Sequence, residues 1–256
     1  MAGNTLLPLA GYPLSRQQLA RRIGTKDPIF KFLEYQALKD AVFYKDDFDY
    51  VALDANRWVV TTKGSTATEW AVSAGLNGRI LGVGGTTAAS SGLQFLSPIA
   101  CFSGDKNAGF EIRYQIDDIT ECRLEMGFVN AFPSINSPCV NNLSTPTFTT
   151  TTNAAIYCYN HTGSTTTSGL YCIGTATVGA ANKTATTTKR PVNNTSQVVR
   201  IQMIGNTVHM WIDGVYMAAA TMEGGDAMKF GVNFKGNSTN DHNWLVDYIA
   251  HWVDRT

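Results

Sequence analysis

The segment VVRIQMIGNTVHMWIDGVYMAAAT, residues 198–221, decides the fold class of this chain. Two dipeptides, Gly205-Asn206 and Asp213-Gly214, divide it into three short runs rich in β-branched and aromatic residues. Two-residue loops of this composition supply the positive φ angles that tight hairpins require. The segment therefore predicts a three-stranded antiparallel meander.

Other segments carry the same signal over most of the chain. In FEIRYQID, residues 110–117, apolar residues alternate with polar ones, and CRLEMGFV, residues 122–129, has a similar pattern. Period-two alternation is typical of a half-buried strand. Further strands are predicted at residues 154–160, 169–177, 228–234 and 243–253. About ten to twelve strands with regularly spaced turns indicate an all-β sandwich or barrel.

The first 45 residues have a different character. They carry seven basic and three acidic side chains, a net charge of +4, whereas the other 13 basic and 17 acidic residues give −4. Residues 15–23 and 28–43 are predicted as short helices, preceded by an extended segment with two prolines. We therefore divide the chain into an N-terminal arm, residues 1–45, and a sandwich, residues 46–256. The arm either packs on its own sandwich as a lid or docks on another chain.

The charge composition limits the class of partner. The chain has 20 basic and 20 acidic side chains, and charged residues make up only 16% of it. Residues 126–182 contain no charged side chain at all. A balanced chain lacks the basic excess that binds a phosphate backbone, so nucleic acid is not an expected partner. No apolar run is long enough to cross a membrane, and the start of the chain has no secretory signal pattern, so synthesis in a cytoplasm is expected.

No metal or cofactor site is expected. The five cysteines lack CxxC spacing and have no paired histidines nearby, which argues against both a zinc site and a disulfide framework. The four histidines are scattered, and no nucleophile motif occurs. His209 alternates with Val208 and Met210 and is interpreted as a surface or interface histidine.

Several motifs resemble the concanavalin A-like (laminin G-like) jelly-roll family. The resemblance covers about residues 46–255 and rests on the Gly205-Asn206 and Asp213-Gly214 turns and on an Asp-Tyr-Ile in the last strand, residues 247–249. The further combination of FEIRYQIDDIT, EMGFVNAFP and TTTTNAAIYCYN looks like the version of this fold in capsid-associated virion proteins of tailed phages. The fold implied is a jelly-roll β-sandwich carrying an N-terminal extended or helical arm.

This resemblance implies a structural virion protein that decorates or cements a capsid. The expected partner is the major capsid protein, and a homo-oligomer, dimer or trimer, is expected because additions to a particle often lie on its symmetry axes. The expected location is the capsid surface. In this hypothesis apolar side chains of the arm anchor the chain on the capsid subunits, and two arginines form ion pairs with acidic groups there. The residues are Leu6, Leu7, Leu9, Tyr12, Leu14, Arg21 and Arg22.

A carbohydrate-binding module is the main alternative. The polar segment GNSTNDHNW, residues 236–244, offers amide and carboxylate groups beside an aromatic ring. Sugars are often bound by such combinations. The candidate residues for a surface glycan are Asn240, Asp241, Asn243 and Trp244.

A glycoside hydrolase is the third possibility, because laminarinase-type enzymes share this fold. Retaining hydrolysis requires two carboxyl groups about 5 Å apart on one strand face. ECRLE offers Glu121 and Glu125 without an Asp between them, and Glu111, Asp117 and Asp118 do not complete such a motif. Glu111 is interpreted as a solvated strand residue. We therefore predict no catalytic residues and no enzymatic activity.

Overall fold

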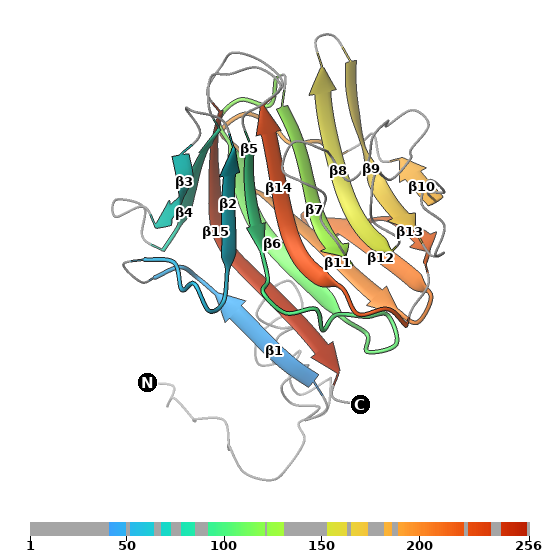
Figure 1. The fold of residues 1–256 in the computed structure, drawn as a ribbon. Helices are drawn as coiled ribbons and strands as arrows, with labels where there is room; N and C mark the ends of the chain where they lie inside the picture. The colour runs from blue at the N-terminus through green and yellow to red at the C-terminus, as the bar shows by residue number, and fades with distance from the viewer. Residues whose placement is uncertain are drawn as a thin grey trace, which may run out of the picture.

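The computed structural model of the chain confirms the predicted fold class. It describes residues 41–49, 52–63, 68–72, 78–84, 92–120, 122–130, 153–162, 165–173, 182–185, 189–222, 225–236 and 242–254. All regular elements in these ranges are β-strands, and they form two antiparallel sheets stacked as a sandwich (Figure 1). The same ranges contain no helix that is long and apolar enough to cross a membrane.

Sheet A has eight strands. Seven follow the order β13-β12-β11-β6-β15-β4-β3, and β1 pairs with the second half of β15 beyond β4. Their bounds are β1 Ala41–Asp46, β3 Thr68–Val72, β4 Ile80–Gly84, β6 Gly109–Ile116, β11 Gln197–Ile204, β12 Thr207–Ile212, β13 Val215–Thr221 and β15 His242–Asp254.

Sheet B has seven strands in the order β10-β9-β8-β7-β14-β5-β2. Their bounds are β2 Val59–Lys63, β5 Gly92–Leu96, β7 Cys122–Val129, β8 Ala154–Thr162, β9 Thr165–Ile173, β10 Asn182–Ala185 and β14 Lys229–Gly236. Neighbouring strands are often far apart in sequence: β14 lies between β7 and β5.

The predicted meander is confirmed in strands β11, β12 and β13. Gly205 has φ +54°, and Asp213 and Gly214 have φ +51° and +74°. These left-handed angles are the ones that two-residue hairpin loops require. The turns place Val208, Met210 and Ile212 in the interior.

Aromatic side chains fill the space between the two sheets. The ring of Phe110 from sheet A lies 4.6 Å from Phe230 and 5.2 Å from Phe128, both from sheet B. All three side chains are fully buried. Burial of each such side chain stabilises the fold by about 1.5–3 kcal/mol.

The predicted helix over residues 28–43 is wrong at its C-terminal end. Residues 41–43 belong to β1, which pairs antiparallel with β15 from Ala41 opposite Asp254 to Asp46 opposite Ile249. Pairing with a long partner strand outweighs a local helical pattern, because helix propensity is a weak preference. The first strand of the sandwich therefore begins before residue 46. The predicted helix over 15–23 and the rest of the arm lie outside the described residues.

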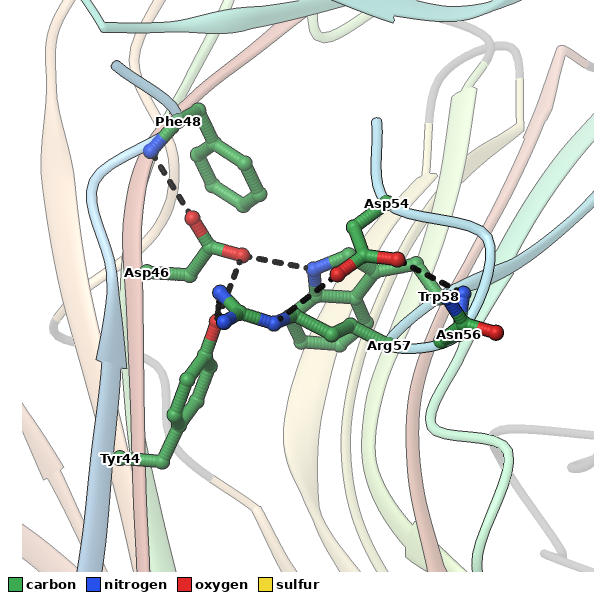
Figure 2. Close-up of polar contacts among 7 residues, drawn as sticks. All are labelled: Tyr44, Asp46, Phe48, Asp54, Asn56, Arg57 and Trp58. Atoms are coloured by element: carbon green, nitrogen blue, oxygen red, sulfur yellow. Dashed lines mark hydrogen bonds and ion pairs between the residues drawn. The ribbon is translucent and has the colours of Figure 1, made fainter. Parts of the chain in front are cut away.

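A buried carboxylate joins β1 to the following chain. Asp46 is 3% exposed and accepts hydrogen bonds from the Phe48 amide at 3.0 Å, the Trp58 indole Nε1 at 2.8 Å and the Tyr44 hydroxyl at 3.2 Å. Figure 2 shows these contacts converging on the carboxylate, with Arg57 bonded to the Tyr44 hydroxyl. We call this arrangement the Asp46 anchor. It connects β1 to the segment that leads into β2.

Candidate functional site

A row of polar side chains crosses the outward face of sheet B. Along β7 the interior face carries Leu124 and Met126, so the alternating residues Arg123 and Glu125 lie on the opposite face. The strand register places Glu125 opposite Asn233 of β14. The polar character therefore continues from one strand to the next.

The row extends to the edge of the sheet. Asn233 is opposite Gln94 of β5, and Gln94 is opposite Thr61 of β2. Glu125, Asn233 and Gln94 are 1%, 4% and 6% exposed, whereas Thr61 on the edge strand is exposed. We call Glu125, Asn233 and Gln94 the polar row. It runs from a buried carboxylate toward solvent at β2.

The carboxylate of the row is held by an ion pair. Arg123 Nη2 lies 2.8 Å from Glu125 Oε1, and Asn233 Nδ2 donates to Oε2 at 3.4 Å. The Arg123 side chain is only 10% exposed. A buried charge requires such compensation, because removing one partner of a buried pair costs about 3–5 kcal/mol.

Two amide atoms of the row have no hydrogen-bond partner within the described part of the chain. They are Gln94 Nε2, a donor, and Asn233 Oδ1, an acceptor, each buried. A buried polar atom without a partner costs about 1–3 kcal/mol. Because Gln94 and Asn233 are register neighbours, a donor and an acceptor are available at the same place. A hydroxyl group, which both donates and accepts, could bond to both atoms.

The described residues do not complete a pair of catalytic carboxylates on this face. Glu121 lies outside the described residues. Arg123 and Glu125 are alternate residues of β7 and share its outward face. Among the described residues, Glu125 is therefore the one acid on this face of β7, and it forms an ion pair with Arg123.

The other acids considered from the sequence have structural contacts. Asp117 accepts hydrogen bonds from the Asn243 amide at 2.8 Å, and Asp118 accepts from the Thr120 hydroxyl at 2.8 Å. Glu111, interpreted as a solvated strand residue, is half-buried in sheet A and accepts a hydrogen bond from the Tyr248 hydroxyl at 2.7 Å. Burial, followed by the Glu111 charge, raises the pKa of Tyr248 well above its ordinary value.

The predicted glycan-binding segment is wrong at Trp244. Trp244 is fully buried, with its ring 4.7 Å from Phe234 and 5.8 Å from Tyr114. The Asn243 side chain is held by Asp117 at 2.6 Å. Strand β15 starts at residue 242, and its alternation turns Trp244 into the interior, where no sugar can stack on the ring. Asn240 and Asp241 lie outside the described residues.

The predicted arm contacts also lie outside the described residues: Leu6, Leu7, Leu9, Tyr12, Leu14, Arg21 and Arg22. The described ranges contain no cluster of three or more His, Cys, Asp or Glu side chains suited to a metal ion.

Sequence reasoning missed the polar row. The signal available was alternation: Arg123 and Glu125 share one face of β7, and Asn233 interrupts the apolar run of β14. Nothing in the sequence places Gln94, about 140 positions earlier, beside Asn233. The sheet order brings them together.

The strand order defines an all-β, jelly-roll type sandwich of two antiparallel sheets, with the buried polar row on sheet B. The fold is similar to the catalytic domain of an endo-1,3-β-glucanase (laminarinase) from Thermotoga petrophila RKU-1, with a TM-score of 0.56 and 15% identity over 83% of this chain and 97% of that one. It is similar to the carbohydrate recognition domain of Emp47p, with a TM-score of 0.58 and 10% identity over 85% and 98%. It also resembles a pseudo β-1,3-glucanase of Mycobacterium tuberculosis, described as an immunostimulatory antigen, with a TM-score of 0.58 and 11% identity over 82% and 98%.

The shared feature at these identities is the fold. The sequence matches no family model and no curated protein. The structural neighbours include both glucanases and a carbohydrate recognition domain. Function has to be argued from the residues of this chain.

Proposed function

We propose that this chain is a glycan-binding protein and that the polar row on sheet B contacts the hydroxyl groups of the sugar. The observation that carries the proposal is the neighbouring pair Gln94 Nε2 and Asn233 Oδ1, a buried donor and a buried acceptor without hydrogen-bond partners among the described residues. Sugar hydroxyls both donate and accept, so they suit a site of this kind. Thr61 extends the row to the exposed edge strand β2.

The names of the structural neighbours support the same class of ligand. One is a laminarinase domain and another is a carbohydrate recognition domain. They are similar in fold only, so they suggest which glycans to test first. The glucanases suggest β-1,3-glucan and mixed-linkage β-1,3-1,4-glucan as test ligands, and the O-glycanase suggests mucin O-glycans.

Binding without cleavage is the expected chemistry. Hydrolysis with retention requires two carboxyl groups about 5 Å apart. On the described part of β7, Glu125 is instead paired with a cation, Arg123. A glycosidase remains a distinct and measurable alternative, because an acid in the part of the chain outside the described residues could supply the second group.

Isothermal titration with laminarin, barley β-glucan and mucin O-glycans tests the proposal. We expect Gln94→Met and Asn233→Leu to weaken binding about tenfold each, since each removes one hydrogen bond to the ligand. Gln94→Met should not lower the free energy of unfolding, because the donor that it removes has no hydrogen-bond partner among the described residues. Gln115→Met, on the outward side of sheet A, is the matched control and should bind like the wild type.

Two results would overturn the proposal. One is the absence of binding of the wild type to all three glycans, and the other is unchanged affinity in both row variants. Release of reducing sugar from laminarin, lost in Glu125→Gln, would establish a hydrolase instead.

The virion role remains a prediction of the sequence. Glycan binding is compatible with it, since an exposed protein on a particle can adhere to a host surface. Location and copy number in a purified particle would test this role, together with the predicted capsid partner and the dimer or trimer.

A further inference from the structure

Aromatic side chains gather on the outward face of the other sheet. On β12 the residues Val208, Met210 and Ile212 are interior, so His209 and Trp211 lie outward, next to Tyr216 of β13. The Trp211 and Tyr216 rings are 5.5 Å apart at 68°, and His209 Nδ1 lies 3.3 Å from the Tyr216 hydroxyl. His209 is thus a surface histidine with an aromatic environment.

A cation continues this arrangement across the sheet. The Arg200 guanidinium of β11 lies 5.0 Å from the ring centre of Trp211 and 5.0 Å from that of Trp252. Trp252 of β15 reaches Arg200 by lying across Gly109 of β6, where a Cβ would lie 2.4 Å from the indole. We call Tyr216, Trp211, Arg200 and Trp252 the aromatic strip. Stacking on both sides fixes the guanidinium, because each cation–π contact is attractive.

One end of the strip is exposed and the other is covered. Tyr216 is 52% exposed, Trp211 is half-buried and Trp252 is 4% exposed. The rings of Trp211 and Tyr216 meet at 68°, so one ring presents its face and the other its edge. The apolar C–H face of a pyranose ring packs well on such aromatic surfaces.

The charges around the strip favour a neutral ligand. Arg200 is the cross-strand neighbour of Glu111, so the two charges offset each other. The nearby Arg113 is paired with Asp247 at 2.9 Å. An acidic ligand such as a nucleic acid would need an excess of free cations, which the strip does not offer.

We infer that the aromatic strip is a second glycan-binding surface, which stacks a neutral β-linked polysaccharide on Trp211 and Tyr216. The inference rests on the proposed function, because it assigns the same ligand class to a separate face. The polar row lies on the outward face of sheet B and the strip on the outward face of sheet A, so the two surfaces lie on opposite sides of the sandwich (Figure 1). Two sites on one polysaccharide-binding chain raise avidity without any change at either site.

Affinity electrophoresis in gels containing laminarin tests the strip. We expect Tyr216→Ala and Trp211→Leu to weaken retention about tenfold. Tyr216→Phe keeps the ring and loses only the contact to His209, so it should bind nearly as the wild type does. Val215→Ala, at an adjacent residue that is 49% exposed, is the matched control and should leave retention unchanged.

The outcomes separate the two surfaces. Weaker binding in Tyr216→Ala with unchanged binding in both Gln94→Met and Asn233→Leu supports the strip and overturns the polar row. Unchanged binding in both strip variants, with weaker binding in Gln94→Met, overturns the strip and supports the row. Sedimentation of wild type and Tyr216→Ala provides a further test. A dimer that becomes a monomer in the variant, without a change in glycan retention, would make the strip a self-association surface and overturn this inference.

Discussion

Replacement of Asp46 by alanine should destabilise the sandwich strongly. The Asp46 carboxylate accepts three hydrogen bonds, two of which come from the buried donors Phe48 N and Trp58 Nε1. The third comes from the half-buried hydroxyl of Tyr44. Alanine removes the carboxylate, so these three donors lose the acceptor of their hydrogen bonds.

The expected loss follows from the number of buried donors. Each buried donor without a partner costs about 1–3 kcal/mol, so Asp46→Ala should lower the free energy of unfolding by about 4 kcal/mol. Trp58→Phe removes one donor and leaves the carboxylate with two, so about 2 kcal/mol is expected. Asp47→Ala is the matched control, since Asp47 is 55% exposed and its pairing with Lys45 is worth less than about 1 kcal/mol.

Urea denaturation followed by far-UV circular dichroism measures these differences in every variant, including those that lack Trp58. In the variants that keep it, Trp58 stacks on Phe95 with ring centres 4.2 Å apart, so its fluorescence gives a second, local probe. A loss in Asp46→Ala below about 1 kcal/mol, or equal to that in Asp47→Ala, would refute the anchoring role. The double variant with Trp58→Phe should lose less than the sum of the two, because both changes remove the same bond.

Three further changes have defined outcomes. Burial lowers the pKa of His251 from 6.5 to about 4, against a smaller opposing effect of Asp46. Between these two pH values the unfolded chain binds a proton that the folded chain does not, so stability should fall by up to about 3 kcal/mol as the pH drops through this window. The urea midpoint of His251→Phe should lose this dependence, and equal pH profiles for the two proteins would contradict the assignment. Gly127→Ala should cost about 3 kcal/mol or more, because φ is +150° and the new Cβ would lie 2.1 Å from the Ala155 carbonyl oxygen. Gly214→Ala should cost only about 1 kcal/mol, because φ is +74° but no atom lies within 4 Å of the new Cβ. Thermal denaturation measures both variants, and a larger loss of stability in Gly214→Ala than in Gly127→Ala would contradict this reasoning.

Local patterns predicted much of the fold. The Asp213-Gly214 turn and the alternation in residues 110–117 are visible in the sequence because hairpin loops and strand faces depend on neighbouring residues. Local patterns failed at residues 41–43, where the helical spacing of the preceding segment continued into a strand. They also misplaced Trp244: a strand was predicted from residue 243, but the local pattern did not show that Trp244 lies on its buried face.

The sequence by itself determined the all-β class, the three-stranded meander and the even charge balance, since each depends on composition or on residues close together in the chain. The tertiary structure decided which polar groups meet. Gln94, Glu125 and Asn233 come from three separate segments and become neighbours only through the order β7-β14-β5. Likewise, Arg200 lies between Trp211 and Trp252 because β11, β6 and β15 are adjacent and Gly109 leaves room for an indole. Sheet order is set by non-local burial and strand pairing, and no short stretch of sequence encodes it.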